Sequence, residues 1–173
     1  MRRFLFIAII MPAFLTACAE LTAPPPISTI ATGAPTAPFS DWAGAAEIIF
    51  AKVNELRQKQ GVAPLQKDER LQQIATAYAR ELAARGELSH FDRDRRTLAD
   101  RLKSADINDW RAAGENLARL SCAGFVAADV VKSWNLSKAH NDAMTDRIYR
   151  RSGLGYAVDA ARVNVYWAQV FAD

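Results

Sequence analysis

The sequence predicts an α+β domain built as a three-layer α-β-α sandwich around an antiparallel or mixed sheet. Apolar side chains recur every three or four positions through most of residues 41–145, which is the period of an amphipathic helix. From residue 153 onward the pattern becomes alternating, as in two strands joined by a tight turn. The second of these strands is apolar on both faces, so both faces need cover. Helices followed by such a hairpin therefore give three layers.

Five helical segments are expected before the hairpin. They span 41–60, 68–85, 97–104, 124–136 and 137–145, the last of them only one or two turns long. The apolar stripes that predict the first four are Ile49, Val53 and Leu56; Leu71, Ile74, Tyr78 and Leu82; Leu98 and Leu102; and Val126, Val130 and Trp134. Ser40 or Asp41 can cap the first helix, and Gly61 and Gly86 suit the ends of the first two.

The two predicted strands span 153–158 and 163–171, with a turn at 159–161. Alternation along the second strand assigns its side chains to two faces. Val163, Val165, Trp167, Gln169 and Phe171 share one face, and Tyr166, Ala168 and Val170 share the other.

The N-terminus has the pattern of a lipoprotein signal peptide. Arg2 and Arg3 precede a short uncharged apolar run that falls well below the ~20 residues of a membrane span. The run ends in Leu-Thr-Ala-Cys18, which resembles a lipobox. We therefore expect residues 1–17 to be removed and Cys18 to carry acyl chains that anchor the protein to a membrane. The alternative is an ordinary signal peptide cut near Ala17, which leaves Cys18 as a free thiol.

Residues 18–40 are expected to form a tether between the lipidated cysteine and the domain at 41–173. This stretch holds five of the seven prolines, with Ser, Thr, Ala and Gly between them, and cannot bury enough apolar surface to fold. The expected location is extracytoplasmic and membrane-anchored. Alanine rather than aspartate at position 19 favours the outer membrane, facing the periplasm, if the cell is Gram-negative.

Composition argues against a nucleic-acid partner. The net charge of +3 falls to +1 without Arg2 and Arg3, since 20 basic residues then face 19 acidic ones. A nucleic-acid-binding domain needs a basic excess gathered on one face. The length suits one domain, which we expect to be monomeric. With Cys18 lipidated, Cys122 is expected to be a free, buried thiol.

Two histidines and one glutamate are the residues that can carry chemistry. If His90, His140 and Glu115 converge, they can hold Zn²⁺, or they can form a proton-transfer site in which the carboxylate orients an imidazole. The sequence contains no H-E-x-x-H, C-x-x-C, G-x-S-x-G or phosphate-binding loop. On spacing alone, a structural role is the commoner explanation for each histidine.

Seven short motifs in order resemble one family. They are Val53-Asn-Glu-Leu-Arg57, Gly61 to Leu65, Leu88-Ser-His90, Gly114-Glu-Asn-Leu-Ala118, Trp134-Asn-Leu-Ser-Lys-Ala-His140, Gly153-Leu-Gly155 and Tyr166-Trp-Ala-Gln-Val-Phe171. Together they resemble the bacterial branch of the CAP superfamily, the cysteine-rich secretory, antigen 5 and pathogenesis-related group, also called SCP-like extracellular proteins. The resemblance runs from about Ile48 to Phe171.

The resemblance implies an α-β-α sandwich with a cleft that carries two histidines and two acids and sometimes holds Zn²⁺ or another divalent cation. His90, Glu115 and His140 match three of these positions, and Ser137 stands where many members have the second acid. Two imidazoles and one carboxylate can still bind Zn²⁺ with water in an open position. Asn116 and Ser137 are then expected to donate or accept hydrogen bonds around this cleft.

The resemblance leaves three functions open. The first is a non-catalytic module that binds a lipid or cell-wall ligand in the cleft, beside an apolar groove lined by Phe91, Trp110 and Tyr149. The alternative is a metal-assisted hydrolase, in which His90 and His140 hold the cation and Glu115 activates water. The third is a purely structural envelope protein. We expect the binding module, because the set of acids and histidines is incomplete.

Overall fold

A four-stranded mixed sheet forms the middle layer of the computed structural model, which describes residues 39–173. The strand order is β1-β3-β4-β2, and the strands span Gln66–Lys67 (β1), Ala113–Ser121 (β2), Arg151–Val158 (β3) and Asn164–Ala172 (β4). The β1–β3 pair is parallel, and the other two pairs are antiparallel. The predicted fold class and the predicted hairpin of β3 and β4 are confirmed.

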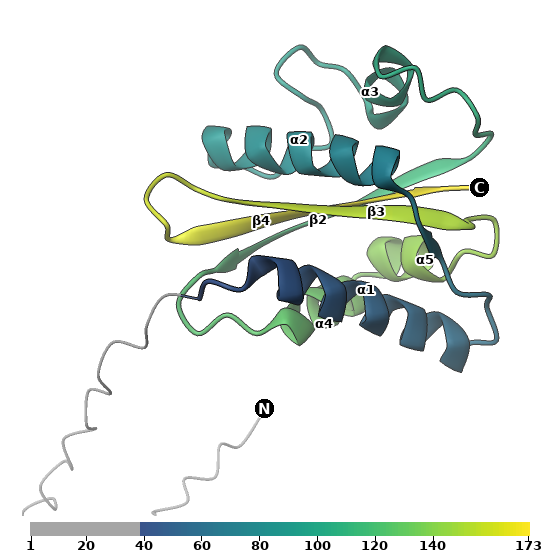
Figure 1. Ribbon diagram of the computed structural model, residues 1–173, viewed down its shortest axis with the longest axis horizontal. Helices are drawn as coiled ribbons and strands as arrows, with labels where there is room; N and C mark the ends of the chain where they lie inside the picture. Colours follow the sequence, from purple (N-terminus) through teal and green to yellow (C-terminus); the bar gives the residue numbers. More distant parts are fainter. Residues whose placement is uncertain (1–38) are drawn as a thin grey trace, which may run out of the picture. The chain divides into compact units, whose positions relative to one another are not determined.

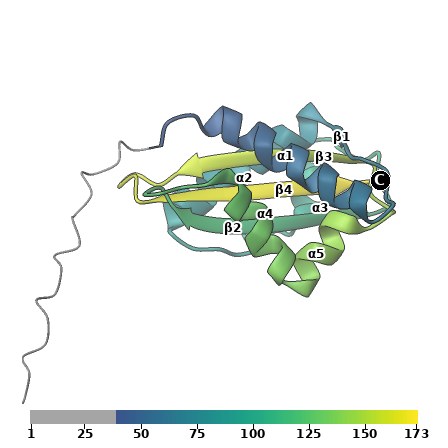
Figure 2. The same ribbon diagram turned by 90° about the horizontal axis from the view of Figure 1, so that it is seen from below.

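Helices cover both faces of the sheet (Figures 1 and 2). α2 (Glu69–Arg85) and α3 (Leu98–Ser104) lie on one face. α1 (Trp42–Lys59), α4 (Ala127–Leu136) and α5 (Lys138–Thr145) lie on the other. Local capping sets these bounds: the Asp68 side chain accepts hydrogen bonds from the first turn of α2, and Gly86 ends that helix in the left-handed conformation.

The core is divided in two by β4. Val165, Trp167 and Phe171 pack with side chains of α1 and α4. Tyr166, Ala168, Val170 and Ala172 pack with side chains of α2 on the opposite face. The alternation predicted along this strand is therefore confirmed from Val165 onward. Val163 lies before the strand and is exposed.

Two glycines of β3 explain how closely α2 approaches the sheet. A Cβ atom on Gly153 would lie 2.0 Å from the backbone nitrogen of Gln72, and one on Gly155 would lie 2.1 Å from that of Thr76. Any larger residue would therefore push the helix away from the strand. The Gly-Leu-Gly sequence thus sets the distance between α2 and the middle layer.

Two strands and one helix start differ from the sequence prediction. Both β1 and β2 were missed, because β1 is only two residues long and β2 carries a glutamate, an asparagine and an arginine among its apolar residues. The fourth helix begins at Ala127, not at residue 124, and Val126 precedes it with an exposed side chain. Val126 therefore does not belong to the buried stripe of that helix.

The predicted signal peptide at 1–17, the lipidated Cys18 and nearly all of the tether at 18–40 lie outside the described residues. Among residues 39–173, no helix combines the length and apolar character that a membrane span requires. Cys122 is buried and makes no disulfide within this part of the chain.

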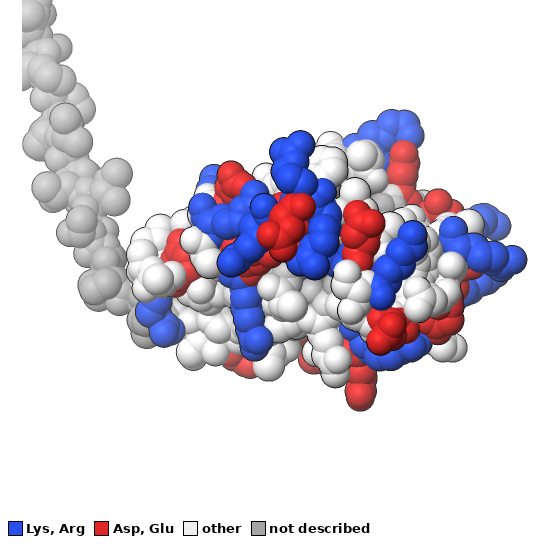
Figure 3. Space-filling model, turned by 90° about the horizontal axis from the view of Figure 1, so that it is seen from above, with Lys and Arg blue, Asp and Glu red and all other residues white. Residues whose placement is uncertain are grey.

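On the face of the molecule that carries α2 and α3, basic and acidic side chains are interspersed (Figure 3).

Candidate functional site

The edge strand β2 positions two neighbouring polar residues on opposite faces of the sheet. Leu117 packs on the α2 side and Ala118 on the α1 side, so alternation places Glu115 on the first face and Asn116 on the second. Because β2 has no strand beyond it, groups from both faces can meet around its edge.

Glu115 is the centre of the site. Its side chain is only 3% exposed, yet it holds a carboxylate that needs partners. Arg101 of α3 donates from Nη2 to both carboxylate oxygens, at 2.9 and 3.1 Å. His90 places Nδ1 3.0 Å from Oε1. The buried charge is thus compensated by a guanidinium on one side and an imidazole on the other.

Arg101 packs against Tyr78, a side chain of α2. Its guanidinium carbon lies 3.4 Å from the centre of the Tyr78 ring, and the side chain is 8% exposed. The Tyr78 hydroxyl donates to the backbone carbonyl of Ser89, the residue before His90. Burial, with a contribution from the charge of Glu115, raises the pKa of Tyr78 to about 12, which keeps this hydroxyl protonated. Tyr78 therefore fixes both the arginine and the loop that carries His90.

His90 is the outward-facing member of the group. Its side chain is 56% exposed, while Nδ1 is occupied by the buried Glu115. A carboxylate on Nδ1 favours the tautomer with the proton there, which leaves the lone pair of Nε2 as an acceptor. The arrangement can therefore accept a hydrogen bond from a ligand, or orient an imidazole toward a cation.

His140 reaches the site from the other face. The Asn116 side chain donates from Nδ2 to the backbone carbonyl of His140 at 2.9 Å, which ties α5 to the edge strand. Burial lowers the pKa of His140, and the charge of His90 lowers it further. Both effects favour the neutral form of the His140 ring.

The sequence predicted hydrogen-bonding roles for Asn116 and Ser137 around the cleft. Asn116 has such a role, but toward the backbone of His140 rather than toward its ring. Ser137 stands at the start of α5, where its carbonyl accepts from the Asn141 amide and its hydroxyl makes no capping hydrogen bond. Its contribution in the structure comes from the backbone.

The residues present do not form a complete metal site. Within residues 39–173, no group of three or more His, Cys, Asp or Glu side chains is arranged to hold a metal ion. In addition, both oxygens of Glu115 already accept from Arg101. Glu115 contacts Nδ1 of His90, whereas the hydrogen bond between Asn116 and His140 involves only the backbone of His140.

The three aromatic residues expected to line a groove differ in their environment. Trp110 donates to the carbonyl of Ile107 and packs into the core beside α2. Tyr149 stacks on Phe171, and its hydroxyl lies against Gly114, where a Cβ atom would be 2.5 Å away. Phe91 is exposed next to His90, with the Arg95 guanidinium over its ring. Of the three, only Phe91 offers an exposed apolar surface.

Sequence reasoning missed Arg101. A signal was present: Leu98, Arg101 and Leu102 stand at positions i, i+3 and i+4, so the arginine lies on the apolar stripe of a short helix. A charged side chain at such a position is buried only with a partner. Here that partner is Glu115, and the two residues are 14 positions apart.

Comparisons with known proteins agree with this fold. The uncharacterized protein YkwD of Bacillus subtilis is 31% identical over 118 residues, which cover 68% of this chain and 43% of YkwD, so this chain spans less than half of that relative. An outer surface protein from Borrelia burgdorferi has a TM-score of 0.68 at 22% identity, covering 78% of this chain and 96% of the Borrelia chain. An extracellular protein with an SCP domain from Bacillus anthracis has a TM-score of 0.65 at 22% identity, covering 79% of this chain and 45% of the other.

The family model of CAP, the cysteine-rich secretory protein family, matches residues 50–171. The matched region includes all four strands of the sheet except the last residue of β4. It also includes His90, Glu115 and His140. The chain therefore belongs to the CAP family of cysteine-rich secretory proteins.

Proposed function

We propose that this CAP-domain protein is a lipoprotein of the cell envelope that binds a ligand in the cleft formed by His90, His140 and Glu115, and that it catalyses no reaction there. The observation that carries the proposal is the pairing of Glu115 with Arg101. Both oxygens of the carboxylate accept from the guanidinium, and Oε1 also contacts His90. The oxygens of Glu115 are therefore already occupied by contacts with Arg101 and His90, which hold these side chains in position.

The same pairing argues against a metal-assisted hydrolase. Catalytic zinc sites use three protein ligands and an open position, and hydrolysis also needs a base that can take a proton from water. With Glu115 held by Arg101, the described residues offer two imidazoles as ligands and no free carboxylate beside them. To act as a zinc ligand or as a general base, Glu115 would have to give up its hydrogen bonds with the buried Arg101.

The chemistry of the cleft indicates the kind of ligand. His90 with its proton on Nδ1 offers Nε2 as an acceptor, and the surroundings of His140 favour its neutral form. Two such imidazoles suit a ligand with hydroxyl or amide donors. Phe91 adds an exposed apolar ring beside His90. A lipid headgroup or a cell-wall component supplies such donors, and both are available to a protein anchored in the envelope.

The anchor is the second part of the proposal. The Leu-Thr-Ala-Cys18 sequence and the proline-rich tether support lipidation at Cys18 and tethering of the domain to a membrane. Two structural relatives are described as an outer surface protein and as an extracellular protein, which is consistent with export. Labelling of cells with radioactive palmitate tests this step: incorporation that is lost in Cys18→Ser supports the anchor, and incorporation that persists contradicts it.

Two titrations test the binding function. In the first, the imidazole NMR signals of His90 and His140 are followed while solubilised envelope lipids or cell-wall fragments are added. We expect both histidines to respond to one class, and a His90→Ala, His140→Ala double variant to lose affinity. If neither class moves either signal, the binding module is wrong.

The second titration adds Zn²⁺ in a calorimeter to the protein and to the same double variant. The binding module predicts weak zinc binding at best, because a third protein ligand is missing. Micromolar binding that disappears in the double variant would favour the hydrolase instead. Glu115→Gln separates the two roles of the acid further: loss of a zinc ligand would abolish micromolar binding, whereas loss of an orienting acid would weaken it about 10–100-fold.

A further inference from the structure

The loop between α2 and α3, residues 86–97, presents two apolar side chains to solvent. Leu88 is 45% exposed and Phe91 is 46% exposed. They are three positions apart, so their Cα atoms lie within about 11 Å of each other. Among residues 39–173, no other two exposed large apolar side chains are fewer than ten positions apart in the sequence. The loop therefore carries a small exposed apolar patch.

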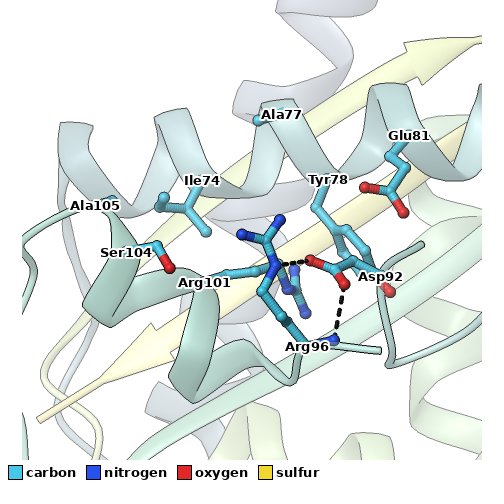
Figure 4. A pocket seen from close by; sticks show the side chains of 9 residues that line it. All are labelled: Ile74, Ala77, Tyr78, Glu81, Asp92, Arg96, Arg101, Ser104 and Ala105. Atoms are coloured by element: carbon cyan, nitrogen blue, oxygen red, sulfur yellow. Dashed lines mark hydrogen bonds and ion pairs between the residues drawn. The ribbon is translucent and has the colours of Figure 1, made fainter. Parts of the chain in front are cut away.

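Hydrogen bonds hold the backbone of this loop in place. The Phe91 carbonyl accepts from Nη1 of Arg85 at 3.0 Å, and the Phe91 amide donates to Oγ of Ser89 at 3.0 Å. Asp92, the next residue, is buried and accepts from the amide and from Nε of Arg96 (Figure 4). Because the backbone around Phe91 is fixed in this way, the exposure of its ring is built into the folded domain.

Three arginines surround the patch. Arg93 and Arg95 are exposed residues of the same loop, and the Arg95 guanidinium carbon lies 5.3 Å from the centre of the Phe91 ring. Arg119 of β2 is exposed and reaches the start of the loop, where its Nη1 donates to the Gly86 carbonyl at 3.2 Å. Basic groups from two elements are thus gathered beside the exposed apolar side chains.

The acidic side chains of the loop are paired with other arginines. Glu87 contacts Nη2 of Arg85, and Arg96 contacts Asp92 and Asp94 at 2.8 and 3.3 Å. Within residues 39–173, no acidic side chain forms an ion pair with any of the three arginines around the patch. The unpaired charge beside the patch is therefore positive, and it complements an anionic surface.

We propose that this loop docks on the surface of an anionic lipid bilayer, with the side chains of Leu88 and Phe91 among the lipid headgroups and the three arginines on the phosphates. Arginine binds phosphate through paired, charge-assisted hydrogen bonds. Aromatic and aliphatic side chains flanked by basic ones are typical of segments that lie in the membrane interface. This docking goes beyond the cleft function and does not depend on which ligand the cleft binds.

The proposed lipidation of Cys18 makes the bilayer the partner at the highest local concentration, and in this respect the inference rests on the proposed function. Residues 19–38 separate Cys18 from the described domain. A chain of this length and proline content reaches about 25 to 60 Å. A tethered domain encounters the same bilayer repeatedly, so a small patch with modest affinity is sufficient for docking. An acidic protein partner has no such advantage.

The test measures how closely the loop approaches a bilayer in the full chain, with ¹³C-labelled leucine methyl groups. Nanodiscs of phosphatidylglycerol and phosphatidylcholine carry a lipid with a nitroxide on its headgroup and are supplied in excess. We expect strong paramagnetic broadening of the Leu88 methyl signals. Leu136 is the internal control and should be broadened little, because it is 81% exposed at the end of α4, on the other face of the sheet. The Leu88 broadening should decrease in discs of phosphatidylcholine alone and at about 0.5 M salt.

One pair of variants tests the apolar part of the patch. Phe91→Ser removes the ring and should lower the docking constant, read from the Leu88 broadening, at least about tenfold. Leu136→Ser removes an exposed apolar side chain from the other face of the sheet and should leave that constant unchanged. Amide spectra confirm that each variant is folded.

A second pair tests the charge. The double variant Arg93→Gln, Arg95→Gln should lower the docking constant roughly thirtyfold, because two basic groups near an anionic surface are lost. The matched control is the double variant Lys59→Gln, Lys132→Gln, which removes two exposed basic groups from α1 and α4. It should dock as the parent does.

Three results would overturn the proposal. The first is Leu88 broadening no greater than that of Leu136, the second is equal broadening in anionic and zwitterionic discs, and the third is loop variants that dock as the parent does. Because lipid is in excess and every variant has the same N-terminus, the loop is tested whether or not Cys18 is acylated. Palmitate labelling tests that anchor separately, and the cleft function is measured with other probes on His90 and His140.

Discussion

The Nη2 nitrogen of Arg101 lies 2.9 and 3.1 Å from the two carboxylate oxygens of Glu115, and both side chains are more than nine-tenths buried. An ion pair at this depth has lost most of its hydration, so each charge depends on the other. The pair also holds the one carboxylate that orients His90. The stability of the fold and the position of the His90 ring therefore depend on the same two side chains.

Removing one member of this pair should be strongly destabilising. Arg101→Met leaves the Glu115 carboxylate buried without its partner, and we expect a loss of about 3–5 kcal/mol in the free energy of unfolding. Urea denaturation at pH 7 measures it. The double variant Arg101→Met, Glu115→Met replaces the pair with apolar side chains and should regain most of that loss. If the double variant is no more stable than Arg101→Met, the unpaired Glu115 carboxylate is not the cause of the lost stability.

Glu115 should determine which nitrogen of His90 carries the proton. With the carboxylate 3.0 Å from Nδ1, the neutral ring is expected in the Nδ1–H form, whereas free imidazole favours Nε2–H. Long-range ¹H–¹⁵N spectra distinguish the two forms. Glu115→Leu should return His90 to the Nε2–H form, while His140 provides an internal reference in the same spectra. An unchanged tautomer in the variant would disprove the orienting role.

His140 should make the fold less stable below neutral pH. Burial and the charge of His90 lower its pKa in the folded state, so the unfolded chain binds the proton more tightly. Stability is then fully present above the unfolded value of about 6.5 and is lost as pH falls through it toward the lower folded value. Unfolding free energies from about pH 7.5 to 5 measure the slope. His140→Gln should flatten it, and a slope identical to the parent would contradict this assignment.

The two glycines of β3 should tolerate no side chain. Gly155→Ala places a Cβ atom 2.1 Å from the Thr76 backbone nitrogen, so α2 must move, and we expect a loss of about 3 kcal/mol or failure to fold. Gly124→Ala is the control, because nothing lies within 4 Å of its Cβ position and only its positive φ is unfavourable, at about 1–2 kcal/mol. Thermal unfolding compares them. A Gly155 variant no less stable than the Gly124 one would mean that the helix can shift freely.

Much of the fold was predictable because its signals are local. Helix periodicity, the Asp68 cap and the terminal glycines act within a few residues, so α1, α2 and α3 were placed to within one or two positions. The β3–β4 hairpin was equally readable from alternation. The strand β2 was not, because its polar residues satisfy contacts with α3 and α5 that no local pattern reveals.

The sequence by itself determined the layers, the family, and the three residues His90, Glu115 and His140 as the candidate site. Only the tertiary structure decided what those residues do to one another. It brought Arg101 to Glu115 and placed His90 and His140 around the edge of β2. The physical reason is that a buried charge takes its role from the partner that compensates it. That partner comes from a different element of the chain, at a distance that no sequence pattern records.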